Sequence, residues 1–353
     1  MRKTNLFFLA FFALGTLFNA CSTDVDLHAD YKDITVVYGL LDSDKDVNYV
    51  KINKAFLPNS ENGNANEIAL IADSCNYPNK LDAKIIEYRA NANGTNYQKT
   101  RELVLDTMTI HNKKPDGFFY HPDQLVYYTN ERVYSNTDQY KYKYELQIDR
   151  GDTVLMAETE MVGGYNPDNH IYFNITTAIL SYAGEYGTPI KFYPCPNAAI
   201  YEVVLKFYFT EIGPSHDSVL RCMEYSLGNY SEAALFETLD HNQYVVKHKS
   251  TRFYSELADY LGKNCDTISQ NIKRIVQDNA ICISIAAGGE ELYNFISVNG
   301  PSSSIVQSIP EYTNVRGGYG VFSSRTLKEK RVNFNSLNDL KRYHPRWGFD
   351  QGK

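Results

Sequence analysis

Strict two-residue alternation along residues 139–149 is the feature that most constrains the fold of this 353-residue chain. Lysine, glutamate and glutamine separate the apolar positions, so one face of the segment is apolar and the other is charged or polar. Because successive side chains of a β-strand point to opposite faces, the pattern predicts a half-buried antiparallel strand. The apolar positions are Tyr140, Tyr142, Tyr144, Leu146 and Ile148.

The same alternation predicts a long strand at residues 199–211. Two helices are predicted at 251–261 and 289–298, where apolar residues recur every three or four positions. The first has Phe253, Leu257 and Leu261 on one face, and a glycine follows it directly. Shorter strands, rich in β-branched and aromatic residues, are predicted at 34–41, 47–56, 83–88, 102–105, 124–129, 153–162, 171–176, 190–193, 219–227, 243–249, 281–286 and 317–323.

Residues 163–169, which read Gly-Gly-Tyr-Asn-Pro-Asp-Asn, interrupt any regular element and separate two groups of strands. Turn residues at 149–152 join the strands on either side of them into a hairpin that ends the first group. We therefore predict a mainly β fold, with a sandwich-like domain at 34–165 and a second β-rich domain at 166–353. The length suits two domains of ordinary size.

The first twenty residues have the order of an export signal. Arg2 and Lys3 precede an apolar run at 6–14, and small or apolar residues lead to Ala20 and Cys21. We predict a signal peptide at 1–20, a fatty-acyl (palmitate-type) anchor on Cys21, and a lipidated polar tether at 21–33. The alternative is an ordinary signal peptide with a chance cysteine near its cleavage site. No later segment has the roughly 20 apolar residues of a membrane-spanning helix.

Composition limits the classes of partner. The net charge is −7, whereas nucleic-acid-binding proteins usually carry a basic face. We therefore expect no nucleic-acid partner. Tyrosine is abundant, with 29 residues, and exposed aromatic rings can stack on sugars. Most of these tyrosines follow strand periodicity, which predicts that they lie in the core or on a sheet surface.

Asp42, Asp44 and Asp46 place three carboxylates at alternate positions, and calcium prefers such clustered hard oxygens. The remainder of a calcium loop is missing, because Val47 stands at the glycine position and Asn53 at the final glutamate position. Asp and Ser are also ordinary turn residues, so these three are weak metal candidates. We expect no metal and no cofactor.

The sequence contains no HExxH, CxxC, GxSxG or GxxxxGK[ST] motif. We therefore expect no enzymatic activity and assign no catalytic residue. The alternative is a hydrolase whose site is assembled from distant residues, because such sites are recognised by geometry.

Five cysteines remain after Cys21, and their pairing is left open because an odd number leaves one thiol unpaired. Cys282 lies in a predicted apolar strand and is expected to be buried. Short Asp-Ser/Thr-apolar stretches resemble O-glycosylation sequons of exported proteins of Bacteroidetes-type bacteria, with acceptors at Thr107, Thr153, Ser218 and Thr267. The five cysteines are Cys75, Cys195, Cys222, Cys265 and Cys282.

Several segments resemble a family of uncharacterised outer-membrane lipoproteins of Bacteroidetes-type bacteria, a domain of unknown function. They read VYGLLD at 37–42, YVKINKAF at 49–56, ELY at 291–293 and PEYTNVRGGYGVFSS at 310–324. The resemblance implies an immunoglobulin-like sandwich at the N-terminus and a second β-rich domain. It implies no reaction, so no catalytic residue is carried over.

The leading hypothesis is a non-catalytic, lipid-anchored outer-membrane protein at the cell surface. It would bind a protein partner in the outer membrane or a ligand, as an accessory to an outer-membrane transporter. Two alternatives remain, a glycan-binding lipoprotein that uses exposed tyrosines and a hydrolase. A concave site lined by aromatic residues favours a glycan, and a buried carboxylate pair or a Ser-His contact favours an enzyme. A flat patch at 312–324 favours a protein partner.

Overall fold

A computed structural model of the chain describes residues 34–55, 71, 75–111, 123–164, 175, 177–178, 180–182, 184–265, 272–299 and 311–352. Contacts group Ile34–Lys353 into one compact unit. The predicted signal peptide, Cys21, the tether and the acceptor Thr267 lie outside the described residues, as does the strand predicted at 171–176 except for residue 175.

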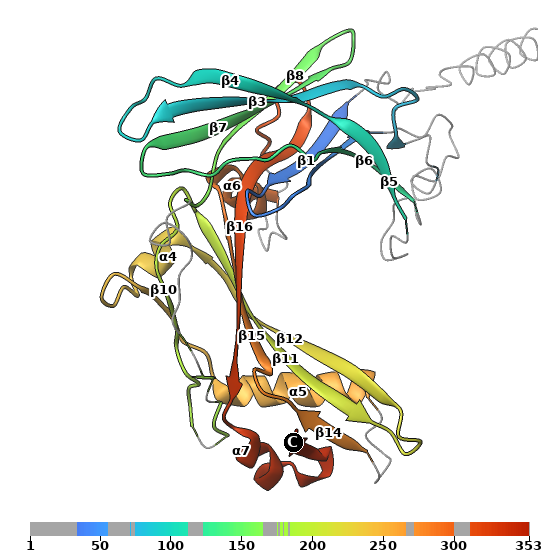
Figure 1. The fold of residues 1–353 in the computed structure, drawn as a ribbon, viewed down its shortest axis with the longest axis vertical. Coiled ribbons are helices and arrows are strands. Elements are labelled where there is room, and N and C mark those ends of the chain that lie inside the picture. The colour runs from blue at the N-terminus through green and yellow to red at the C-terminus, as the bar shows by residue number, and fades with distance from the viewer. Residues whose placement is uncertain are drawn as a thin grey trace, which may run out of the picture. The chain divides into compact units, whose positions relative to one another are not determined.

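The described part of the chain is mainly β, as the sequence predicts (Figure 1). The largest sheet has the strand order β17-β14-β11-β15-β16-β1-β2-β6-β5, and β12 and β9 pair with β11 and β16 beside this path. A four-stranded sheet has the order β4-β3-β7-β8. The strands of the first half are β1 (Thr35–Leu41), β2 (Asn48–Lys54), β3 (Asp82–Asn91), β4 (Gln98–Val104), β5 (Asp106–Ile110), β6 (Gln124–Thr129), β7 (Tyr140–Asp149) and β8 (Val154–Glu160).

Strands β1, β2 and β6 share one core with the four-stranded sheet. In β7, Tyr142, Tyr144, Leu146 and Ile148 are buried in that core and Lys141 is exposed, as the alternation predicts. Glu145 departs from the pattern, because it belongs to the predicted polar face but is also buried. The β7–β8 hairpin is also confirmed, since Asp149 pairs with Val154. Strands of two sheets therefore enclose one core, as in a β-sandwich. The immunoglobulin-like topology stays a prediction.

Strand β16 (Tyr319–Phe334) differs most from its prediction as a short strand at 317–323. Its first residues pair in parallel with β1, and residues Arg325–Val332 pair antiparallel with β15 (Ile281–Gly288). A strand from the end of the chain thus extends the sheet of the first half, across the predicted division at residue 165, and Figure 1 shows it reaching from β1 to β15.

Gly320 makes the parallel pairing with β1 sterically feasible. Its φ is +107°, and an added Cβ would lie 1.9 Å from the Val37 carbonyl oxygen. Only glycine combines this backbone conformation with so close an approach. The glycine at the start of β16 therefore has a packing reason, because the backbone of β1 approaches it closely.

The second core lies around β11 (Ile200–Ile212), whose alternate residues Tyr201 to Phe209 are buried as predicted. β12 (Ser218–Ser231) pairs along one edge of β11, and β15 and β14 (Lys273–Val276) pair along the other. Helix α5 (Ser250–Asn264) buries Phe253, Leu257 and Leu261, which confirms the predicted helix and its apolar face.

The prediction also missed several short elements, because few residues carry their pattern. They are α4 (Glu232–Phe236), α7 (Leu337–Tyr343), the 3-10 turn η3 (Pro345–Trp347), β9 (Thr177–Ala178), β14, β17 (Phe349–Gln351) and β5. β10 (Ile190–Phe192) and β13 (Tyr244–Val246) form a separate two-stranded sheet near their predicted places. Helix α6 (Glu290–Asn299) matches its prediction.

Candidate functional site

A groove of about 510 Å³ lies between α6 and the outward face of β1, β2 and β16. Strand alternation produces its sheet-side wall. In β2, Val50 and Ile52 are buried, so Tyr49 points outward and is 41% exposed. In β1 the same rule exposes Tyr38 by 46%. The aromatic and charged residues that line the groove are Tyr38, Asp42, Lys45, Tyr49, Phe295 and Arg325.

Helix α6 supplies the opposite wall. Leu292, Phe295 and Ile296 line the groove, yet no residue of this helix is fully buried, in contrast to α5. The Phe295 ring meets the Tyr38 ring edge to face, with centroids 6.0 Å apart. An amphipathic helix normally buries its apolar stripe, so α6 leaves apolar surface open to a ligand.

Glu291 fastens α6 to the sheets. Its Oε2 accepts hydrogen bonds from Ser323 Oγ at 2.9 Å and from Thr159 Oγ1 at 3.1 Å. Burial raises the pKa of Glu291 above its ordinary value, although these two hydrogen bonds oppose the rise. The helix is therefore held from both β16 and β8, and its groove-facing side chains are positioned by a polar anchor.

Asp42 lies at the end of β1, where the loop to β2 begins, and only 2% of it is exposed. The Asn48 side chain clamps its backbone, since Asn48 Oδ1 accepts from the Asp42 N–H at 2.7 Å and Asn48 Nδ2 donates to the Asp42 carbonyl at 3.2 Å. Asp42 Oδ1 accepts the Asp44 N–H at 3.0 Å. Within the described residues, Oδ2 accepts no hydrogen bond.

Arg325 provides the counter-charge of this carboxylate, but at a distance. Its Nε lies 3.8 Å from Asp42 Oδ2, beyond hydrogen-bonding range. The Arg325 side chain is 47% exposed, and Lys45 also lines the groove. Burial raises the pKa of Asp42, and the Asp44 N–H and the two cations only partly offset this. A buried carboxylate oxygen without a hydrogen-bond donor is rare and requires a physical explanation.

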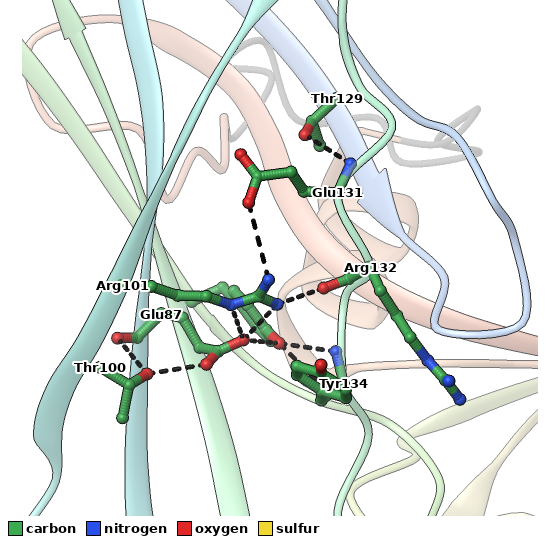
Figure 2. A network of polar contacts seen from close by, with 8 residues as sticks. Glu87, Thr100, Arg101, Thr129, Glu131, Arg132 and Tyr134 are labelled. Atoms are coloured by element: carbon green, nitrogen blue, oxygen red, sulfur yellow. Dashed lines mark hydrogen bonds and ion pairs between the residues drawn. The ribbon is translucent and has the colours of Figure 1, made fainter.

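A second concavity, of about 390 Å³, lies against the same loop and is strongly polar. Asp44, Lys45 and Asp46 line it together with Arg132. Figure 2 shows how the Arg132 segment is held, because the Arg132 carbonyl accepts a hydrogen bond from the Arg101 guanidinium. The Arg132 side chain itself extends away from that contact.

Glu87 is the centre of the network in Figure 2 and is 3% exposed. Its Oε2 accepts from Arg101 Nη2 at 2.7 Å and Nε at 2.9 Å, and from the Tyr144 hydroxyl at 2.9 Å. Its Oε1 accepts from Thr100 Oγ1 at 2.7 Å. Burial, followed by the charge of Glu87, raises the pKa of Tyr144. Every oxygen of this buried carboxylate is occupied, so the network is structural in character.

The structure separates the three aspartates proposed as weak metal candidates. Asp42 is buried, whereas Asp44 pairs with Lys328 at 2.7 Å and Asp46 is exposed. Among the residues that the structure describes, no group of three or more His, Cys, Asp or Glu side chains is placed to hold a metal ion.

The other predicted sites lie apart from the groove. Thr153 and Ser218 are exposed, and Thr107 is half-buried in β5. Cys282 is buried as predicted, and the thiols of Cys222, Cys265 and Cys282 are free. Burial, and then Glu211, raises the pKa of Cys265 to about 11.

Sequence reasoning missed the groove, although part of its signal was present. The alternation in β2 places Tyr49 on the face opposite Val50 and Ile52. Nothing local indicated that α6 and Arg325, both more than 240 positions away, would meet that face. Such long-range proximity follows from the pairing of β16 with β1.

No protein-family model matches the chain, and no curated protein sequence is significantly similar to it. In the described part of the chain, no helix is both long and apolar enough to cross a membrane. Fold and groove together define a mainly β protein with an aromatic, partly charged surface site.

Proposed function

We propose that this chain is a non-catalytic, lipid-anchored binding protein of the outer membrane, and that the groove beside α6 binds a glycan at the cell surface. The observation that carries the proposal is that two exposed rings, Tyr38 and Tyr49, and the half-buried ring of Phe295 share one concave site with charged and polar groups. Ligand sites typically combine apolar and aromatic walls with a few convergent polar groups.

The anchor and the body have separate tasks in this proposal. The Cys21 acyl chains hold the protein at the membrane, because each buried methylene contributes about 0.8 kcal/mol. The immunoglobulin-like sandwich presents the groove to solvent. No residue is proposed as catalytic, since Glu87 is fully hydrogen-bonded and Glu211 is paired with Arg274 at 2.8 Å and Arg221 at 2.9 Å.

A glycan array probed with the detergent-solubilised, full-length lipoprotein tests the function. The expected result is binding to one class of oligosaccharide without its hydrolysis, and at least tenfold weaker binding by Tyr49→Ala. The matched control is Tyr186→Ala, because Tyr186 is also exposed but does not line the groove. A chain that binds none of the glycans refutes the proposal, and release of reducing ends refutes its non-catalytic part.

A second candidate function is an accessory subunit of an outer-membrane transporter, with a protein partner on the apolar side of the groove. The exposed side chain of Ile296 favours it, because unpartnered apolar helix surface is typical of protein contacts. A detergent pull-down from the native membrane tests this function. A stoichiometric partner that is lost with Ile296→Asp supports it, and recovery of the lipoprotein alone contradicts it. Cys21→Ala serves as the unanchored control.

A further inference from the structure

We infer that the ligand of the groove is a neutral carbohydrate, and that one of its hydroxyl groups donates to Asp42 Oδ2 while a neighbouring hydroxyl accepts from the Arg325 guanidinium. This inference rests on the function proposed above and adds the class of glycan. It assigns Asp42 and Arg325 as the residues that determine specificity.

The Asp42 carboxylate has unmet hydrogen-bonding capacity. The Asn48 clamp and the Asp44 N–H fix this residue from three sides, so its carboxylate is held rigidly at the groove. Oδ2 is buried with no donor among the described residues. Leaving a buried acceptor unsatisfied costs about 1–3 kcal/mol, and a ligand hydroxyl that supplies the missing donor recovers part of that cost.

Asp42 and Arg325 lie side by side without a direct hydrogen bond. Arg325 Nε and Asp42 Oδ2 are 3.8 Å apart, too far for a direct hydrogen bond. The Arg325 side chain is about half exposed, and its guanidinium makes no hydrogen bond within the described residues, so it can turn toward an incoming ligand. Two adjacent hydroxyl groups match an acceptor and a donor placed side by side, because each hydroxyl both donates and accepts.

The groove is lined by charges of both signs, one carboxylate and two cations, so a ligand with a strong charge of either sign meets a like charge in it. A cationic ligand would meet Arg325 and Lys45 in the groove. An anionic ligand would meet the Asp42 carboxylate, with Asp44 and Asp46 on the other side of the same loop. A neutral ligand avoids both repulsions while using the same hydrogen bonds. Specificity of this kind arises from the mismatch with the wrong ligand as much as from contacts to the right one.

The aromatic walls complete the match to a sugar. Tyr38 and Tyr49 lie on the sheet side, and Phe295 lines the groove from α6 with its ring against Tyr38. A pyranose ring has an apolar C–H face and a polar rim. The aromatic side chains can stack on the C–H face while Asp42 and Arg325 form hydrogen bonds with hydroxyl groups of the rim. A volume of about 510 Å³ falls within the usual range of roughly 300–1,000 Å³ for ligand sites.

The test compares two glycan panels on the full-length lipoprotein in detergent. The neutral panel holds fragments of β-glucan, α-glucan, mannan and galactan, and the acidic panel holds fragments of polygalacturonate and chondroitin sulfate. We expect binding on the neutral panel only. Asp42→Asn, which keeps the oxygen that accepts from Asp44 but replaces the free oxygen by an amide, should weaken binding at least tenfold. Arg325→Ala should weaken it by a similar factor.

The control variant is Asp46→Asn, an exposed residue of the same loop that does not line the groove, and it should bind as the wild type does. Periodate cleavage of vicinal diols in the bound glycan should abolish binding. Binding to the acidic panel only, or undiminished binding by Asp42→Asn, overturns the neutral-ligand inference and leaves glycan binding intact. Absence of binding to both panels refutes the proposed function itself. Circular dichroism of each variant verifies that it is folded.

Discussion

Glu87 and Asp42 are both buried carboxylates of the first half of the chain, but they differ in how completely they are hydrogen-bonded. Glu87 is surrounded by Arg101, Tyr144 and Thr100, each within hydrogen-bonding distance (Figure 2). Asp42 has one oxygen with a donor and one without. The first arrangement satisfies every oxygen of the carboxylate, whereas the second leaves one buried oxygen without a hydrogen-bond donor among the described residues.

The contrast shows that burial alone does not define a functional carboxylate. A buried charge with complete hydrogen bonds has no capacity left for a ligand, although removing it is costly. A buried charge with incomplete hydrogen bonds lowers stability and retains that capacity. The predictions below test this difference, from the largest expected effect to the smallest.

Glu87→Ala should lower the free energy of unfolding by about 3 kcal/mol, because it removes the carboxylate to which Arg101 and the Tyr144 hydroxyl both donate. Urea denaturation followed by circular dichroism measures this loss. Glu158→Ala is the control, since Glu158 forms a more exposed pair with Lys143 and should cost no more than about 1 kcal/mol. Equal losses in the two variants would contradict a structural role of the Glu87 network.

Tyr144→Phe should lower the free energy of unfolding by about 1–2 kcal/mol, because it removes one donor to Glu87 and one acceptor for the Tyr134 N–H. The ring itself stays in the core. Ligand binding in the groove should not change, because Tyr144 does not line it. An effect on binding larger than the effect on stability would show that the two regions are coupled.

Asp42→Asn should raise the free energy of unfolding at pH 7 by up to about 1 kcal/mol, since it removes a charge that burial disfavours. The same variant is expected to bind glycan more weakly, so stability and binding move in opposite directions. The loss of both in this variant would show that Asp42 is a structural residue like Glu87.

The stability difference between Asp42→Asn and the wild type should depend on pH. Folding raises the pKa of Asp42, so above the ordinary value of 3.8 the unfolded chain has lost a proton that the native state still holds. The unfolding free energy of the wild type therefore falls as pH rises from that value, until the native carboxyl has ionised. The variant lacks this decrease. Parallel urea titrations between pH 3.5 and pH 7 measure it, and a difference that stays constant with pH contradicts the raised pKa.

Much of the secondary structure could be predicted because its causes are local. Alternation in β7 and β11 and the apolar stripe of α5 each follow from residues within one segment. The candidate site could be predicted only in fragments. The sequence marks Asp42 only as a weak metal candidate in a calcium-type loop. It predicts neither the burial of Asp42 nor the proximity of Arg325.

The sequence by itself determined that this protein is mainly β, where its principal strands and its two longer helices lie, and which faces of them are apolar. Only the tertiary structure decided that β16 pairs with both β1 and β15, and that α6 faces Tyr38 and Tyr49. The physical reason is that a side-chain period is set within a few residues, whereas strand partners far apart in the chain are chosen by the packing of the whole core. The groove exists only because these distant strands pair, and so does the surrounding of Asp42 Oδ2 that leaves it without a hydrogen-bond donor among the described residues.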